Sequence, residues 1–386
     1  MPGHRPGIVK PPHVSRVLGS QFSVDLVIAR PRITVHPVQP LSEYNIPALA
    51  QTLCEWGFKP SHAGRQLRCY YLHNGHLPLE GLDLPKPLRE RLAAEFRLMQ
   101  THIALRQASA DGTVKLLIQA ADAQTVESVL MPDYREDRVA GCLSTQVGCA
   151  MGCDFCATTR AGFQRNLSAG ELVEQFFHLR REAAVAHRRL RTVVFMGMGE
   201  PMLNLDNVLE AVRHMACNEL GAIGWRQITV STVGLIPGID RMAAANLNIH
   251  LAISLHAPDD TTRGRLLPMA QHYPITQVMA AADRYQAATG RPVTLQYCLL
   301  AGINDSLTQA DQLATLLSNR RMHLNVLLYN RTGPGPSGTE YHRPDDATID
   351  AFVARLHERR VVAHIRRSRG GDIDAACGQL KARNAE

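Results

Sequence analysis

From about residue 138 onward, short apolar runs alternate with longer amphipathic segments. Short runs bounded by turn residues are typical of buried strands, whereas apolar positions repeating every three to four residues predict helices. The runs that predict strands are residues 139–147, 191–197, 227–233, 249–257, 292–300 and 323–329. The segments that predict helices are residues 168–184, 205–216, 239–246, 275–289, 306–318 and 347–360.

This alternation predicts a parallel sheet covered by helices. Six strand–helix units are fewer than the eight of a closed barrel. We therefore expect an α/β fold, a partial (β/α)6 barrel over residues 138–386, with a further strand at 361–368. Functional side chains of such folds gather at the C-terminal ends of the strands, so the polar residues there are candidates.

A different pattern precedes the barrel. Residues 1–40 are rich in Pro, Arg and His without periodicity, which predicts a basic, partly flexible extension. Apolar positions at helical spacing predict a small helical module at 41–100, which could contact RNA. Residues 103–121 hold an Asp-Gly turn between two strand-like runs, and 126–132 resemble a third strand. Residues 101–137 therefore predict a β-hairpin extension.

Composition narrows the class of protein. The 386 residues are 45% hydrophobic and 20% charged, as in a globular chain. A formal net charge of +7 suits a polyanionic partner such as RNA, although charge alone is weak evidence. No apolar run is long enough to span a bilayer, and the N-terminus lacks the apolar core of a signal peptide. We expect a cytoplasmic monomer without membrane contact.

Four of the nine cysteines fall within residues 141–165, and three of them, Cys149, Cys153 and Cys156, have the spacing C-x3-C-x2-C. Thiolates select zinc, copper(I) or an iron–sulfur cluster. Spacing alone leaves three interpretations open: an iron–sulfur cluster, a zinc site, or reduced structural cysteines without a metal. A [4Fe–4S] cluster held by three cysteines leaves one iron open to another ligand. A zinc-bound RNA-binding protein without catalysis would instead need Cys142 as fourth ligand.

Six stretches resemble the RlmN/Cfr family of radical S-adenosylmethionine (SAM) RNA adenosine methyltransferases. They read VESVLMP, CLSTQVGCAMGCDFCATTRAGFQRNL, GMGEPMLN, STVGLIPGI, AISLHAP and RGGDIDAACGQL, in family order. The resemblance implies a [4Fe–4S] cluster held by Cys149, Cys153 and Cys156, with SAM on the open iron. It also implies two SAM molecules per turnover and an electron donor such as flavodoxin.

The resemblance further implies three catalytic residues. Cys377 would carry the methyl group as S-methylcysteine, and its carbon would join the adenine through a transient thioether. Glu127 would accept the ring proton, and Cys142 would resolve the thioether by forming a transient disulfide with Cys377. The implied product is an adenosine methylated at C2, or at C8 as in Cfr. The implied substrate is 23S rRNA, with tRNA as a second; modification of a different RNA is the alternative.

Further matched positions would bind SAM, namely Gly199, Glu200, Ser231, Ser254, Leu255, His256 and Asn330. Strand-end turns and an ordinary hydrogen-bonded histidine are the structural alternatives for Gly199, Glu200 and His256. Gln296 departs from the family pattern, because C2-methylating members often have Glu there. The basic residues expected to hold the RNA backbone are Arg366, Arg367 and Arg369, with Arg180, Arg181, Arg188, Arg189 and Arg191 as further candidates.

Overall fold

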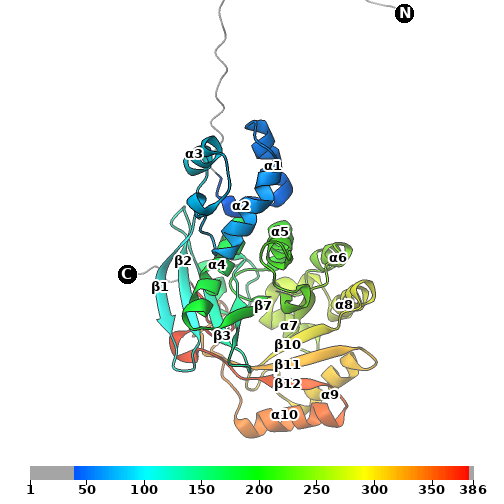
Figure 1. Cartoon of the computed structure of the whole chain (residues 1–386). Helices are drawn as coiled ribbons and strands as arrows, with labels where there is room; N and C mark the ends of the chain where they lie inside the picture. The colour runs from blue at the N-terminus through cyan, green and yellow to red at the C-terminus, as the bar shows by residue number, and fades with distance from the viewer. Residues whose placement is uncertain (1–38, 382–386) are drawn as a thin grey trace, which may run out of the picture. The chain divides into compact units, whose positions relative to one another are not determined.

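The computed structural model describes residues 39–381, which belong to one compact unit, drawn in colour in Figure 1. The extension expected at 1–40 lies outside the described residues except for its last two positions. In the described part of the chain, no helix combines the length and apolar character needed to cross a membrane.

Three helices form the N-terminal part: α1 (Ile46–Glu55), α2 (Ser61–Leu72) and α3 (Lys86–Glu95). Asn45 begins α1 by accepting the backbone N–H of Ala48, which satisfies one of the free donors of the first turn. The apolar stripes that the spacing predicted are buried. They include Leu49, Leu53, Leu88 and Leu92.

One ten-stranded sheet dominates the fold, in the order β1-β2-β3-β4-β7-β8-β9-β10-β11-β12. The antiparallel part consists of β1 (His102–Ala108), β2 (Val114–Gln119) and β3 (Thr125–Pro132), and β3 pairs with β4 (Arg138–Cys142). All later pairs in this sheet are parallel. The later strands are β7 (Arg189–Phe195), β8 (Ile228–Thr232), β9 (His250–Ser254), β10 (Val293–Leu299), β11 (Met322–Leu328) and β12 (Ala363–Arg366).

Helices connect the parallel strands. They are α4 (Ala169–Val185), α5 (Leu205–Ala216), α6 (Ile236–Ala244), α7 (Asp260–Leu266), α8 (Ile275–Thr289), α9 (Leu307–Leu317) and α10 (Asp346–Glu358). Alternation along a strand sends successive side chains to opposite faces. On β8, Ile228 and Val230 join the core shared with the helices, while Thr229 and Ser231 face the other way and are half-buried. Figure 1 shows α5, α6 and α8 together along one side of these strands.

The first predicted strand is shorter than the expected 139–147. β4 ends at Cys142, and β5 (Gln146–Gly148) pairs instead with β6 (Phe163–Asn166) in a separate two-stranded sheet. Ser144 explains the break, because its backbone N–H donates to Gln175 Oε1 at 2.9 Å and its hydroxyl donates to the Glu127 carbonyl at 2.6 Å. These bonds replace those of the strand ladder.

Candidate active site

The cysteine loop follows β5 and ends at the 3-10 helix η3 (Ala157–Ala161). A tight turn brings its start back onto its end: Gly148 has φ +74°, and the Cys149 N–H donates to the Gly162 carbonyl at 3.0 Å. A Cβ on Gly148 would lie 1.7 Å from that carbonyl oxygen, so no other residue fits there.

The three loop thiols lie close enough to interact electrostatically. Burial raises the pKa of Cys149, to about 12, and also that of Cys153 and Cys156. Cys156 raises the pKa of both other thiols further, and Cys149 raises that of Cys153. Among residues 39–381, no three His, Cys, Asp or Glu side chains are arranged to hold a single metal ion. A donor set of three thiols has the soft chemistry that an iron–sulfur cluster requires, so the residues fit that cofactor.

Gly199 and Glu200 lie beside this loop, at the end of β7. The Gly199 backbone hydrogen-bonds the Cys149 thiol, and Glu200 raises the pKa of Cys149 and Cys153. Glu200 is buried, and burial raises its own pKa. Its carboxyl oxygens accept the N–H groups of Met202 at 3.0 Å and Val233 at 2.9 Å. Glu200 therefore connects the end of β7 to the end of β8, which agrees with the alternative that Gly199 and Glu200 form a turn at the strand end. The same residue also lies next to Cys149 and Cys153.

A row of polar side chains crosses the face of the sheet opposite the helices. The register aligns Ser254 on β9 with Gln296 on β10 and Asn325 on β11. Ser231 on β8 is aligned with Ala252 of the same face. Asn325 is a residue that sequence reasoning missed, although an asparagine within the apolar run 322–328 was a signal of this face.

His256 follows β9 in the left-handed region, with φ +58°. Its Nδ1 accepts the Cys298 N–H at 2.9 Å, and burial lowers its pKa to about 3, so the ring is neutral with its proton on Nε2. Its ring lies edge-on to Phe155 of the cysteine loop, with ring centres 5.0 Å apart. The preceding Leu255 is fully buried and donates its N–H to the Gln296 carbonyl at 3.0 Å.

Two expected SAM residues are less closely connected to the cysteine loop. Asn330 lies directly after β11 and Ser231 near the end of β8, and both are half-buried. Within residues 39–381, no hydrogen bond joins either side chain to the cysteine loop. The prediction that Ser231 and Asn330 bind SAM therefore rests on their positions at the ends of the strands.

Cys377 lies in a loop after β12, which we call the Cys377 loop (residues 370–381). This loop contacts the cysteine loop directly: the Ala157 N–H donates to the Gly378 carbonyl at 2.7 Å, and the Thr158 hydroxyl donates to the Leu380 carbonyl at 2.6 Å. Solvent reaches the Cys377 side chain. Surrounding protein nevertheless raises the pKa of its thiol, as does Cys156.

Two buried thiols lie within electrostatic reach of Cys377. Burial raises the pKa of Cys142 at the end of β4, and Cys377 raises it further. All three are free cysteines. The two thiols expected to form a transient disulfide therefore interact electrostatically, and the disulfide itself stays a prediction. The other buried thiol is Cys298, whose pKa is raised by burial and then by Cys377 and Cys156. Strand alternation places Cys298 on the same face as Gln296.

Glu127 on β3 is buried and held by two partners from different segments. Its Oε1 lies 3.1 Å from Lys115 Nζ on β2, and its Oε2 accepts the Lys381 N–H at 2.9 Å. Glu127 thus contacts the Cys377 loop, as its expected role requires. Lys115 was missed at the sequence level, although a lysine within the apolar run 114–118 was a signal.

The candidate RNA-binding arginines occupy different surroundings. Arg366, Arg367 and Arg369 are exposed and immediately precede the Cys377 loop. Arg180 and Arg181 on α4 donate to the carbonyls of Tyr71 and Asn74, so they hold α4 against α2. Arg188, Arg189 and Arg191 lie at the start of β7, which is the end of the strand opposite the cysteine loop.

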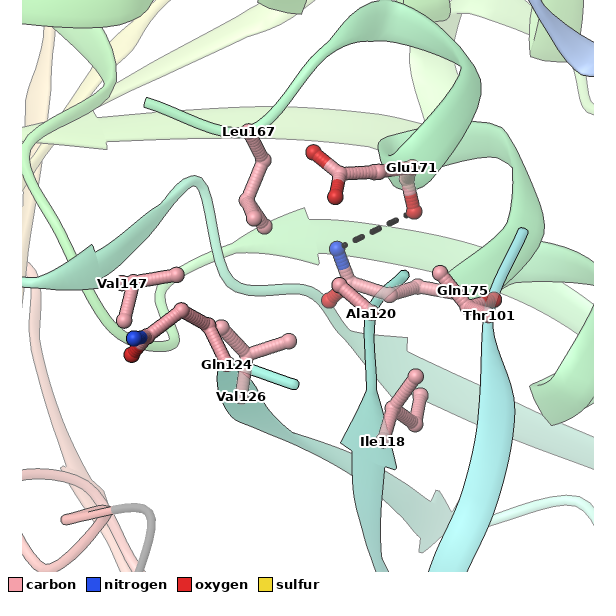
Figure 2. A pocket seen from close by; sticks show the side chains of 9 residues that line it. All are labelled: Thr101, Ile118, Ala120, Gln124, Val126, Val147, Leu167, Glu171 and Gln175. Atoms are coloured by element: carbon pink, nitrogen blue, oxygen red, sulfur yellow. Dashed lines mark hydrogen bonds between the residues drawn. The ribbon is translucent and has the colours of Figure 1, made fainter. Parts of the chain in front are cut away.

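A small pocket lies between the hairpin strands and α4, among Ile118, Val126 and Leu167 (Figure 2). Its volume of about 10 Å³ has room for about one water molecule. Figure 2 also shows Gln175 donating to the Glu171 carbonyl, at 3.4 Å. The pocket contains none of the expected site residues.

Comparisons with known proteins agree with this geometry. Residues 143–313 match the Radical SAM superfamily. The chain is 59% identical over 346 residues to a protein of Opitutus terrae named probable dual-specificity RNA methyltransferase RlmN 1, covering 90% of this chain and 98% of that one. A Thermus thermophilus protein named probable dual-specificity RNA methyltransferase RlmN is 46% identical over 302 residues, covering 78% and 83%.

A solved structure extends the match to the fold. The crystal structure of a radical SAM methyltransferase from Sphaerobacter thermophilus superimposes with a TM-score of 0.84 at 40% identity, covering 89% of this chain and all of that one. The expected fold class is confirmed. The family brings with it a [4Fe–4S] cluster and SAM. This chain belongs to the RlmN family of radical SAM RNA methyltransferases.

Proposed function

We propose that this chain methylates C2 of an adenosine in RNA, with C8 as the second choice. The relatives are named RlmN, which supports methylation at C2. Their names also include the term dual-specificity, which supports two RNA substrates, and we propose 23S rRNA and tRNA. The observation that supports the mechanism is the contact between the two loops, together with the electrostatic interaction of Cys377 with Cys142 and Cys156.

We assign one set of residues to binding the cofactors and a second set to transferring the methyl group. Cys149, Cys153 and Cys156 hold the cluster, which when bound supplies the electron that cleaves SAM to a 5′-deoxyadenosyl radical. The residues proposed to bind SAM are Gly199, Glu200, Ser231, Ser254, Leu255, His256 and Asn330. One SAM per turnover methylates Cys377 and a second provides the radical, with a donor such as flavodoxin as the electron source.

Three side chains then complete the transfer. The S-methyl group of Cys377 would lose a hydrogen atom to the 5′-deoxyadenosyl radical, and the resulting methylene carbon would bond to the adenine ring, so that a thioether joins protein and RNA. Glu127 takes the ring proton. Cys142 attacks the Cys377 sulfur, which forms a disulfide and releases the methylated base. We propose that residues 41–100 and Arg366, Arg367 and Arg369 help to hold the RNA, and that the protein acts as a monomer.

Replacing the paired thiols tests this division. Cys142→Ala should accumulate a covalent protein–RNA adduct, because nothing resolves the thioether, whereas Cys377→Ala should form none. Denaturing gels with labelled RNA measure both outcomes. Cys217→Ala, which replaces a half-buried cysteine outside the site, is the control and should turn over normally. Methylated RNA from Cys377→Ala would refute the methyl-carrier role.

The nature of the cofactor and the product are tested separately. Anaerobically prepared protein should contain iron and sulfide, and zinc without iron would contradict the enzymatic proposal. Mass spectrometry of nucleosides from treated 23S rRNA and tRNA should show 2-methyladenosine. Finding 8-methyladenosine instead would select the second choice.

A further inference from the structure

A buried ion pair connects the β2–β3 hairpin with the site. Lys115 and Glu127 are 6% and 5% exposed. The register places Leu117 opposite Glu127, so Lys115 lies diagonally across from Glu127 on the same face. Lys115 Nζ reaches Glu127 Oε1 at 3.1 Å. Both charged groups are therefore enclosed by protein rather than exposed to solvent.

Both members of the pair also bind the Cys377 loop. Lys115 Nζ donates to the Asp374 carbonyl at 3.3 Å, and the Lys381 N–H donates to Glu127 Oε2 at 2.9 Å. Lys381 Nζ in turn lies 3.0 Å from Asp374 Oδ2. Asp374 and Lys381 flank Cys377 in the sequence, so these contacts close a ring around the loop that carries it.

Stability alone does not account for such a pair. Dehydrating two charges commonly cancels their mutual attraction, and apolar residues of similar size often serve a fold equally well. The neighbours of Lys115 on its strand are apolar, and Val114 and Leu116 are buried. A positioning role gives a reason for an ammonium at this point, because it binds a carboxylate and a backbone carbonyl from two different segments at once.

We propose that Lys115 is a positioning residue of the methyl transfer, whose ammonium holds the Glu127 carboxylate and the Cys377 loop in one fixed arrangement. The inference rests on the roles proposed above for Glu127 and Cys377. The ammonium orients Oε1 and the Lys381 N–H orients Oε2. A remaining carboxylate lone pair takes the ring proton, while the electron pair of the broken C–H bond stays on the ring.

Lys115→Met removes the ammonium and keeps most of the apolar side chain. We expect the variant to bind iron and to methylate Cys377 normally, because neither step uses Glu127 and the contacts of Ala157 and Thr158 still hold the Cys377 loop. The protein–RNA thioether should persist about ten to a hundred times longer, the range expected when a reacting group is misplaced. Peptide mass reports Cys377 methylation, and denaturing gels of quenched time points report the thioether. Lys115→Arg keeps the cation and should recover part of the rate.

Arg106→Met is the matched control. It removes an ion pair between Arg106 on the neighbouring strand β1 and Glu182 on α4, at 2.9 Å, which touches neither Glu127 nor the Cys377 loop. The control should resolve the thioether at the unchanged rate. If Lys115→Met does not fold, Lys115→Gln gives the same comparison and retains a hydrogen-bond donor.

Glu127→Gln separates failure of this inference from failure of the proposed function. If Glu127→Gln resolves the thioether at the unchanged rate, Glu127 is not the proton acceptor and the proposed function fails at that step. If Glu127→Gln traps the thioether but Lys115→Met does not, only the role of Lys115 is overturned. In the double variant, Lys115→Met should add no delay to that of Glu127→Gln, because Lys115 acts through Glu127. A further delay would overturn the inference.

Discussion

At the scale of single residues, one buried carboxyl group links the N-terminal segment to α4. Glu174 is fully buried and accepts the Ser42 hydroxyl at 2.6 Å, the Thr101 hydroxyl at 2.6 Å and the Gln100 N–H at 3.0 Å. Burial raises its pKa from 4.5 to about 7, although these hydrogen bonds oppose the shift. The folded protein therefore binds the Glu174 proton more tightly than the unfolded chain does.

Glu174→Gln should change the pH dependence of stability in one direction. The stabilising contribution of Glu174 is fully present below its unfolded pKa of 4.5 and is lost as the pH rises through about 7. The free energy of unfolding of Glu174→Gln, relative to the unchanged protein, should therefore increase between pH 4.5 and pH 7. Urea unfolding at a series of pH values measures this difference. Glu55→Gln, at an exposed position, is the control, and a difference that falls with pH would contradict the prediction.

Single residues also show what the sequence could predict. The cluster cysteines, Cys142 and Cys377 follow from motifs, because their chemistry depends on residue type and spacing. Lys115 and Cys298 carry no motif, and their importance comes from what the fold packs against them. The surroundings of Lys115 come from residues far along the chain, because Asp374 contacts Lys115 itself and Lys381 contacts its partner Glu127.

At the scale of elements, the β1–β2 turn holds the start of the Cys377 loop. The Ser109 hydroxyl donates to Asp372 Oδ1 at 2.6 Å, and the Gly370 N–H donates to Asp111 Oδ2 at 3.0 Å. Asp111 also accepts the Thr113 N–H at 2.9 Å, which shapes the turn itself. Figure 1 shows the red C-terminal segment beside the cyan hairpin.

Asp111→Ala should loosen this contact. The variant loses one hydrogen bond within the turn and one to the loop, each worth about 1 kcal/mol. Amide hydrogen exchange of residues 370–380 should become faster, while that of the parallel strands stays unchanged. Asp133→Ala is the control, since Asp133 accepts an N–H in another turn, from Arg135 at 3.5 Å, and does not contact the loop. Unchanged exchange in residues 370–380 would refute the role of the turn.

The prediction of strands succeeded where the sequence has short, uninterrupted apolar runs. The runs at 191–197, 227–233, 249–257, 292–300 and 323–329 each overlap a parallel strand, because uninterrupted apolar residues suit a sheet covered by helices. The run at 139–147 was wrong in length, because Ser144 forms side-chain hydrogen bonds in place of a ladder. β6 was missed because FQRN is polar and pairs only with β5.

At the scale of the whole molecule, exposed arginines lie at both ends of the parallel strands. Arg367 and Arg369 are exposed beside the Cys377 loop, whereas Arg189 and Arg191 are exposed at the opposite end of the strands. The net charge of +7 attracts RNA to the protein as a whole. Under the proposed role of Cys377, the arginines near it are the ones placed to position an adenosine, so we expect the two groups to contribute differently to RNA binding.

The double variant Arg367→Gln/Arg369→Gln should weaken RNA binding and lower its dependence on salt. Each lost phosphate contact removes about 0.7 to 0.9 from the slope of log affinity against log salt concentration, so the slope should fall by about 1.5. Binding titrations at several salt concentrations measure the change. Arg189→Gln/Arg191→Gln removes the same charge at the far end and should leave the slope nearly unchanged. Equal effects of the two variants would show that the charge acts without regard to position.

The contact between the cysteine loop and the Cys377 loop also constrains the order of events during biosynthesis. Thr158 and Leu380, which join the two loops, are 222 residues apart. Chains are made from the N-terminus at about 5 to 20 residues per second, so a ribosome completes the cluster cysteines some ten seconds or more before Cys377. Under the roles proposed above, a nascent or truncated chain that ends before residue 370 would contain all three cluster ligands and no methyl carrier. Such a chain would generate radicals without a methyl group to transfer, so we expect the cluster to be loaded only after the chain has folded.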